Sequence, residues 1–270
     1  MRYALGLEYD GAGFFGWQRQ SGSASVQQCV ENALAVVANH AVTVICAGRT
    51  DTGVHARGQV VHFDSASQRS ARQWMLGINS NLPTAVRAIW IREVDDNFHA
   101  RFGAYSRSYR YSILNRWVRP AIGAAYYGWC RQALDAERMH TAAQVLSGKH
   151  DFSAFRSAGC SAQHANRDVT AISVQRQDDL VYIDITANAF LYHMVRNIVG
   201  SLMSVGRGDK SVAWFAEVLQ GRDRKLAGVT AESQGLCLVN VRYDAKYQLP
   251  EQTEAFPFAE CAEDQLNGDE

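Results

Sequence analysis

One short segment of the sequence brings together residue types that can perform nucleophilic chemistry. Residues 47–63 hold Arg49 and Asp51 between two apolar stretches, with Gly48 and Gly53 on either side of the aspartate. Glycine lets the backbone turn tightly there, and the arginine can keep a partly buried carboxylate ionised because opposite charge offsets lost hydration. A poorly hydrated carboxylate is a competent nucleophile. The alternative is an ordinary turn in which Arg49 and Asp51 form a surface ion pair.

The elements that must position this segment follow a regular order in the first part of the chain. Two helices are predicted, one opening at the Ser25-x-x-Gln28 capping box and one running from Ser70 to about residue 79. Alternating or β-branched stretches predict strands at residues 2–9, 42–48, 58–63 and 86–94. The order is therefore β-α-β-β-α-β, which is the ferredoxin-like pattern.

The second part of the chain is predicted to repeat this order. Helices are predicted after Asp135 and over residues 193–205 and 212–219, and strands at residues 104–114, 126–130, 169–175, 181–187 and 236–243. The chain is therefore predicted to be α+β, with two ferredoxin-like, RRM-like halves (residues 1–103 and 104–246) and a central cleft between them. Helices on one sheet face would leave the other face for RNA, as in four-stranded RNA-binding modules.

Charge is unevenly distributed along the chain. The sequence has 27 basic and 27 acidic residues, but residues 251–270 contain seven acidic and no basic ones. Removing those seven leaves 20 acidic against 27 basic residues in the first 250. A basic body suits a polyanionic partner such as nucleic acid. The acidic segment at residues 247–270 has little to pack and is predicted to be a mobile tail.

Several classes of protein are excluded by what the sequence lacks. No apolar run reaches the ~20 residues that a membrane span needs, and the acidic Glu8 comes too early for a secretory signal, so a cytoplasmic protein is expected. The six cysteines form no C-x-x-C pair and the histidines form no H-E-x-x-H motif. No phosphate-binding glycine-rich motif is visible. We therefore expect neither a metal nor a small-molecule cofactor.

The segment around Asp51 also matches a known motif. Residues 48–63 fit the pattern Gly-Arg-Thr-Asp-x-Gly-Val-His-x-x-Gly-Gln-Val-x-His-Phe at every fixed position. This pattern resembles the active-site motif of the tRNA pseudouridine synthase A (TruA) family. Further matches follow in the expected order, at residues 8–11, 15–18, 98–102, 109–111, 150–155, 187–190 and 193–200. The resemblance spans roughly residues 5 to 245 and implies the pseudouridine synthase fold.

The resemblance also implies an activity and roles for individual residues. Members of this family isomerise uridine to pseudouridine at tRNA positions 38, 39 and 40 in the anticodon arm, as homodimers and without a cofactor. By this resemblance, Asp51 is the nucleophile and Tyr109 stacks on the target uracil. Arg49 assists base flipping and pairs with the aspartate, whereas Arg196 is an arginine of the C-terminal half that contacts it.

Other positions of the motif set are implied to lie near the bound tRNA. Residues 160–167 depart from the usual family sequence, so the resemblance assigns no RNA contacts to residues 159–163. The implied RNA-binding residues are Arg69, Phe98, His99, Ala100, Arg101 and Phe102. For Phe98 and Phe102, packing in the core is the alternative.

The chemistry explains why such residues are needed. The target base must leave its stack, the N1–C1′ bond must break, and the base must rejoin the sugar through C5. Asp51 could attack C1′ or C6, or take the C2′ proton in a glycal route, and either Tyr109 or Asp51 could accept the C5 proton. Two other functions stay open: a non-catalytic RNA-binding protein, and a pseudouridine synthase with another RNA target. The intact Asp51 motif favours an enzyme, because binding alone does not need that carboxylate.

Overall fold

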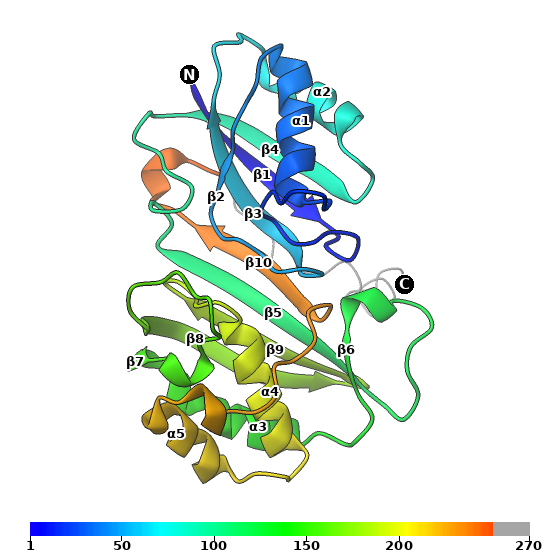
Figure 1. Cartoon of the computed structure of the whole chain (residues 1–270), viewed down its shortest axis with the longest axis vertical. Helices are drawn as coiled ribbons and strands as arrows, with labels where there is room; N and C mark the ends of the chain where they lie inside the picture. The colour runs from blue at the N-terminus through cyan, green and yellow to red at the C-terminus, as the bar shows by residue number, and fades with distance from the viewer. Residues whose placement is uncertain (251–270) are drawn as a thin grey trace, which may run out of the picture.

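The N-terminal half of the chain folds into a ferredoxin-like unit. The computed structural model describes residues 1–250, and Figure 1 shows this half at the top. Its elements are β1 (Arg2–Tyr9), α1 (Val26–Ala38), β2 (Ile45–Cys46), β3 (His55–Asp64), α2 (Ala71–Asn81) and β4 (Val86–Val94). Strand β1 lies between β4 and β3, β2 pairs with β3, and all three pairings are antiparallel. This is the strand arrangement that the β-α-β-β-α-β order predicts.

Local sequence signals begin both helices of this half. The Ser25 side chain accepts a hydrogen bond from the backbone N–H of Gln28, so this residue caps α1. At α2 the capping box is complete, because Ser70 and Gln73 each bond to the other's backbone. Each cap satisfies backbone donors that the first helical turn leaves unpaired.

The C-terminal half repeats the arrangement and extends it. Its long elements are β5 (Ser106–Asn115), β6 (Gly128–Cys130), α3 (Ala136–Ala143), β7 (Gly148–Asp151), β8 (Asn166–Gln177), β9 (Leu180–Ala187), α4 (Met194–Gly206), α5 (Val212–Gly221) and β10 (Leu236–Arg242). Short 3-10 turns complete it at η1 (Ala124–Tyr126), η2 (Gln144–Leu146), η3 (Ser153–Phe155), η4 (Arg224–Leu226) and η5 (Ala245–Tyr247). The strand order is β10-β5-β9-β8-β7, so β10, β5, β9 and β8 take the same places as β4, β1, β3 and β2.

A single strand joins the two halves into one sheet. Strand β10 pairs in parallel with the start of β3, with Cys237 opposite His55 and Leu238 opposite Ala56. Strand β2 has only two residues and pairs further along the same edge of β3. The shortness of β2 therefore leaves the edge of β3 open to β10. The units predicted as residues 1–103 and 104–246 share a continuous sheet as a result.

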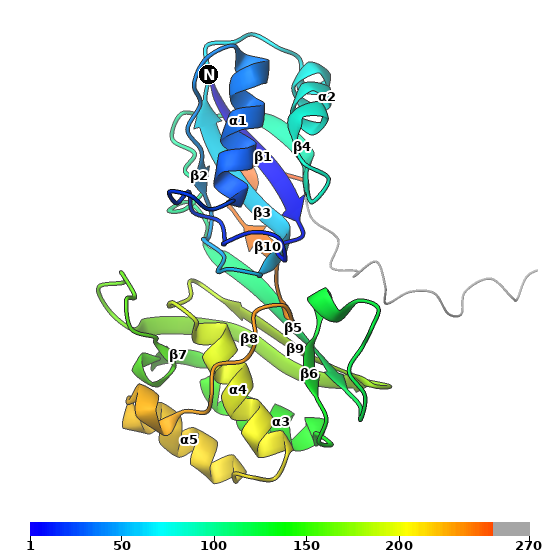
Figure 2. The same ribbon diagram turned by 45° about the vertical axis from the view of Figure 1, so that its right-hand side comes forward.

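The five α-helices of residues 1–250 lie on one side of this sheet (Figure 2). Helices α1 and α2 cover the N-terminal half, and α3, α4 and α5 cover the C-terminal half on the same side (Figure 2). The chain connecting β2 to β3, residues 47–54, leaves the sheet between these two helical groups. The predicted functional loop therefore sits at the junction of the halves.

The end of the described chain packs against the body. Tyr247 meets the ring of Phe98 edge-on at 5.0 Å between centroids, and Leu249 is partly buried against the core. These residues stand at the start of the segment predicted to be a mobile tail, and from residue 251 that prediction lies outside the described residues. Within the described chain, no helix is long and apolar enough to cross a membrane.

The joining strand yields a test of how the halves depend on each other. Leu238 is fully buried in β10, so Leu238→Ala is expected to lower the free energy of unfolding by about 2–5 kcal/mol. The exposed Leu76 of α2 is the control, because Leu76→Ala is expected to stay within about 0.5 kcal/mol. Urea denaturation followed by tryptophan fluorescence and circular dichroism measures both. Separate transitions for two halves would contradict the shared sheet.

Candidate active site

The loop that carries Asp51 is held in place mainly by backbone contacts. The carbonyl oxygen of Thr50 accepts a hydrogen bond from the Trp17 N–H at 3.0 Å, and the Thr50 hydroxyl lies 2.8 Å from the Tyr9 hydroxyl. Gly16 has a positive φ of 89°, and a Cβ there would lie 2.8 Å from the Thr50 carbonyl oxygen. Glycine is thus required for two loops to approach this closely, and the turn around Asp51 is fixed from the N-terminal half.

The Asp51 side chain points across the junction toward helix α4. Its Oδ2 atom lies 3.4 Å from Nε2 of His193 and 3.6 Å from Nη1 of Arg196, and the side chain is 24% exposed. Arg196 is itself held by a 2.8 Å hydrogen bond from its Nε to the carbonyl oxygen of Ala231. The carboxylate from one half therefore meets two nitrogen donors from the other half.

The expected pairing of Arg49 with Asp51 is wrong for this structure. Among residues 1–250, no ion pair joins Arg49 to Asp51, and Arg49 is exposed at the edge of the cleft. The physical reason is the direction of the turn, which aims Asp51 at α4. His193 and Arg196 occupy the place at the carboxylate that sequence reasoning gave to Arg49.

Burial and neighbouring charges set the ionisation of this pair of groups. Burial raises the pKa of Asp51, and the positive charges of His193 and Arg196 partly oppose that rise. Burial lowers the pKa of His193, with Arg196 and Arg224 adding to the effect and Asp51 opposing it. His193 also stands at the N-terminus of α4, where the helix dipole favours an anion. The result is a carboxylate with little hydration beside cationic and N–H groups.

Asp51 lies in a large cleft whose lining is strongly cationic. The cleft has a volume of about 870 Å³, and Asp51 is the only acidic residue among the described residues that line it. Five arginines line the same cleft: Arg49, Arg101, Arg107, Arg167 and Arg196. Because α1 and α4 both contribute to its wall, the cleft opens between the two helical groups. A cationic cleft of this size concentrates polyanions.

Tyr109 stands in this cleft with an aromatic neighbour. Strand β5 buries the Tyr109 ring, which meets Phe190 edge-on at 5.0 Å between centroids. Burial and the nearby Asp51 carboxylate raise the pKa of the Tyr109 hydroxyl well above its usual range. The structure therefore brings together Asp51, Arg196 and Tyr109, three of the residues that the sequence proposed, and Tyr109 offers a protonated phenol and a flat ring.

Only part of the predicted RNA-binding segment at residues 98–102 is exposed on the surface. Phe98 and Ala100 are fully buried, so their side chains are not exposed to a ligand in this structure. Phe98 packs against Tyr243 at 5.0 Å and belongs to the core. Arg101 and Phe102 are exposed and line the cleft.

Two further predicted RNA contacts lie away from the cleft lining. His99 is partly buried against Phe102, with ring centroids 4.5 Å apart. Arg69 donates a 2.6 Å hydrogen bond to the carbonyl oxygen of Val37, beside the end of α1. The described residues that line the Asp51 cleft include neither His99 nor Arg69.

Sequence reasoning missed two residues that the structure places at the site. His193 precedes Arg196 by three positions, a spacing that puts both on one side of the start of α4. Arg107 is buried and donates hydrogen bonds to four backbone carbonyl oxygens, those of Ala104, Asn188, Ala47 and Arg101. The sequence did contain a signal for Arg107. It lies two residues before Tyr109 in a predicted strand, and alternate residues of a strand share one face of the sheet.

The described part of the chain holds no candidate metal centre. Within residues 1–250, no group of three or more histidine, cysteine, aspartate or glutamate side chains could hold a metal ion. The buried thiols of Cys46 and Cys237 have their pKa raised to about 12 by burial, which makes them poor nucleophiles. Within the described lining of the cleft, Asp51 is thus the side chain best suited to nucleophilic chemistry.

Comparison with known proteins agrees with this geometry. The family model described as tRNA pseudouridine synthase matches residues 7–103 and 142–244. Two ferredoxin-like units sharing one sheet, with an aspartate loop at their junction, thus form the pseudouridine synthase fold. Solved structures match only remotely: a chain in a Cbf5-Nop10-Gar1 complex is 11% identical with a TM-score of 0.37, covering 87% of this chain and 48% of that chain. That likeness is too distant to carry an argument.

Curated relatives are much closer. The protein named tRNA pseudouridine synthase A from Xylella fastidiosa (strain M23) is 54% identical over 93% of this chain and 98% of its own length. Proteins of the same name from Aeromonas hydrophila subsp. hydrophila and Thiobacillus denitrificans are 52% and 49% identical, covering 93% and 96% of this chain and 93% and 100% of their own lengths. The chain belongs to the tRNA pseudouridine synthase A family, and it is an isomerase.

The raised pKa of Asp51 gives a test of the site's electrostatics. A carboxyl group whose pKa is higher in the folded than in the unfolded state lowers stability above the folded pKa, and this cost disappears below the unfolded value of about 3.9. Asp51→Asn is therefore expected to melt at a higher temperature than the parent at neutral pH. The difference should shrink as pH falls through the carboxyl range and vanish below it.

Thermal melts over a series of pH values measure this difference. Asp209→Asn is the control, because Asp209 is exposed and is not among the described residues that line the cleft, and it should show no such trend. If the parent melted higher than Asp51→Asn at neutral pH, the contacts with His193 and Arg196 would outweigh the burial of the carboxylate.

Proposed function

We propose that this protein converts uridine to pseudouridine at positions 38, 39 and 40 of tRNA, with Asp51 as the nucleophile. The observation that carries the proposal concerns the cleft lining within residues 1–250, which has one carboxylate and five arginines, with His193 and Arg196 of the other half beside that carboxylate. A cleft that only bound RNA would gain nothing from a buried negative charge. The names of the curated relatives support tRNA as the substrate.

The cleft has the features that an extruded nucleotide needs. Its volume of about 870 Å³ is ample for a base and its ribose, and its arginines can offset the repulsion among phosphates. Tyr109 offers a ring face for the target uracil, and stacking on an aromatic ring contributes about 1–3 kcal/mol per base. Arg49, exposed at the cleft edge, is proposed to enter the stem-loop when the target base leaves its stack.

The reaction keeps every atom of the substrate. The N1–C1′ bond breaks, the base turns, a C5–C1′ bond forms, and the proton on C5 leaves while N1 gains one. Asp51 is proposed to act at the sugar–base junction, by attack on C1′ or C6 or by taking the C2′ proton. Burial supports each route, because a weakly hydrated carboxylate is a stronger nucleophile and base. The C5 proton passes to Asp51 or Tyr109.

We also propose that the protein is a homodimer in the cytoplasm. The family resemblance implies a dimer in which one tRNA touches both subunits, and a tRNA substrate implies a compartment where tRNA is present. Light scattering coupled to size exclusion would measure the mass, and a monomer that is fully active would contradict the dimer.

Release of the C5 proton provides the direct test of the nucleophile. Unmodified tRNA tritiated at uracil C5 is expected to release tritium to water with the parent and with the Asp209→Asn control, whereas Asp51→Asn is expected to release none. The expectation follows because every proposed route needs the charge of the Asp51 carboxylate. Sequencing of the modified tRNA should place pseudouridine at positions 38, 39 and 40.

Three outcomes would contradict this proposal in different ways. Binding of tRNA by the parent without any tritium release would favour the non-catalytic RNA-binding protein. Release at other positions or from another RNA would favour a pseudouridine synthase with a different target. Release by Asp51→Asn at the parent's rate would remove Asp51 from the chemistry.

A second prediction concerns the Tyr109 ring in the cleft. Tyr109→Ala is expected to bind tRNA within a few-fold of the parent, because the arginines of the cleft carry most of the affinity. Its turnover at saturating tRNA should fall by about 5- to 150-fold from lost stacking alone. Filter binding and single-turnover tritium release measure the two quantities. Unchanged turnover would remove Tyr109 from the mechanism, and Tyr109→Phe would separate the ring from the hydroxyl.

A further inference from the structure

An exposed cluster of arginines and tryptophans lies outside the cleft. It comprises Arg116, Trp117, Arg119, Trp129 and Arg131, which we call the Arg–Trp platform, and these residues lie between β5 and α3. Trp117 is 69% exposed and the neighbouring Ile122 is 92% exposed. The described residues that line the Asp51 cleft include none of these five. The platform is therefore a surface separate from the proposed catalytic cleft.

The platform is ordered by contacts among its own members. The Arg131 guanidinium lies 3.3 Å from the centroid of the Trp117 ring, and the Arg119 guanidinium lies 4.5 Å from the centroid of the Trp129 ring. The Trp129 indole N–H donates a 3.0 Å hydrogen bond to the carbonyl oxygen of Arg116. Residues 116–119 and residues 129–131 thus each place an arginine against a tryptophan of the other segment. A ligand would meet a surface whose side chains are already restricted, which lowers the entropy cost of binding.

The charge of the platform selects the kind of partner. Residues 116–134 contain three arginines and no acidic residue or lysine. A second copy of the chain placed here about a two-fold axis would bring like charges together. Guanidinium groups bind phosphate through paired N–H donors, and exposed rings and guanidinium planes stack on unpaired bases. The platform therefore fits a nucleic acid better than another copy of itself.

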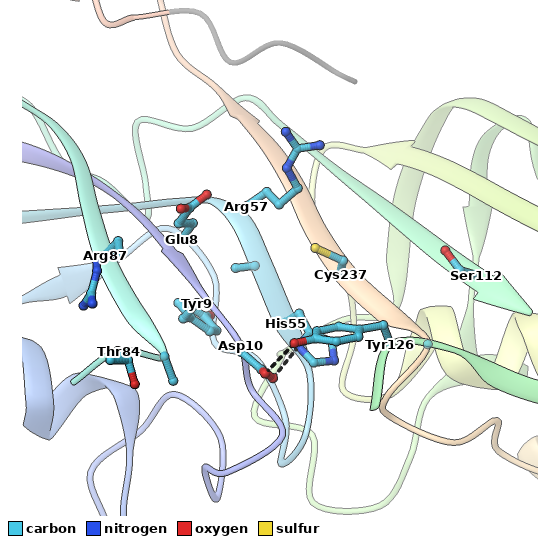
Figure 3. Close-up of a pocket in the computed structure, with 13 residues that line it drawn as sticks. Glu8, Tyr9, Asp10, His55, Arg57, Thr84, Arg87, Ser112, Tyr126 and Cys237 are labelled. Carbon is cyan, nitrogen blue, oxygen red and sulfur yellow. Dashed lines mark hydrogen bonds and ion pairs between the residues drawn. The ribbon is translucent and has the colours of Figure 1, made fainter. Parts of the chain in front are cut away.

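The platform is also fixed relative to the catalytic loop. The same segment continues to Tyr126, whose hydroxyl donates a 2.8 Å hydrogen bond to Asp10 at the end of β1 (Figure 3). His55, the first residue of β3 after the Asp51 loop, lies 2.9 Å through its Nε2 from the carbonyl oxygen of Ala125. Strand β5 connects Tyr109 in the cleft to Arg116, seven residues later, a path of about 23 Å. The platform thus lies well away from Tyr109 in the cleft, and these hydrogen bonds fix its position relative to the N-terminal half.

We propose that the Arg–Trp platform is a second RNA-binding site, which takes phosphates and an unpaired base of the tRNA outside the anticodon arm. This inference rests on the proposed function, because it assumes that the target uridine occupies the cleft. The arginines neutralise phosphates and the face of Trp117 away from Arg131 stacks on a base. A short hairpin that carries only the anticodon arm would fill the cleft without reaching the platform.

The test compares two RNAs with the same set of variants. Arg119→Glu with Arg131→Glu is expected to weaken binding of full-length tRNA at least about ten-fold, and to reduce the slope of log affinity against log salt by about 2. Trp117→Ala is expected to weaken it about 5-fold or more through lost stacking. Binding of the anticodon-arm hairpin, and tritium release from either RNA at saturation, should not change. Arg72→Glu with Arg138→Glu, on exposed positions of α2 and α3, is the charge-matched control.

Several results would overturn the proposal. An unchanged affinity and salt slope for full-length tRNA would show that the platform binds no RNA. Equal weakening for the hairpin would show that it contacts the anticodon arm itself. A platform variant that becomes monomeric by light scattering, while the control does not, would assign this surface to self-association. Tritium release by the parent chain tests the proposed function separately, so failure of either idea can be recognised.

Discussion

The contact between the Asp51 carboxylate and the start of helix α4 is the interaction on which this structure depends. A carboxylate that is largely withdrawn from water needs opposite charge or polar donors nearby. Here Arg196 supplies the charge and His193 supplies a ring nitrogen, both from the other half of the chain. The loop around Asp51 is therefore stabilised from one half and made chemically useful by the other. Anything that separates the halves removes both the charge pairing and the cleft.

The shared sheet keeps the halves at the distance that this contact requires. Each half alone is a common ferredoxin-like unit with an incomplete sheet edge. Because β2 stops after two residues, β10 can hydrogen bond to β3 close to the loop that carries Asp51. The buried guanidinium of Arg107 adds a second tie, since it bonds to the carbonyl oxygen of Ala47 at the start of that loop and to Asn188 in the other half. The position of the Asp51 carboxylate relative to α4 therefore depends on contacts from both halves of the chain.

The sequence predicted what local patterns and motif positions carry. Helix caps, strand alternation and the order of elements gave the α+β class, and the motif led to Asp51 together with Arg196. Contacts between distant segments could not be predicted in this way. The direction of Arg49, the burial of Phe98 and the role of His193 depend on how loops from different elements meet, which no local period encodes. The join through β10 likewise depends on the length of β2, and strand ends are poorly marked in sequence.

The position of β10 near the C-terminal end of the described chain affects how the protein folds during synthesis. Strands β3 and β10 are neighbours in space but separated by most of the chain, so this pairing forms only after nearly all of the protein has left the ribosome. A nascent chain already contains Asp51 but has neither helix α4 beside it nor a closed cleft. Such a fragment lacks the contact between Asp51 and α4. The order of synthesis therefore delays assembly of the cleft until the chain is nearly complete.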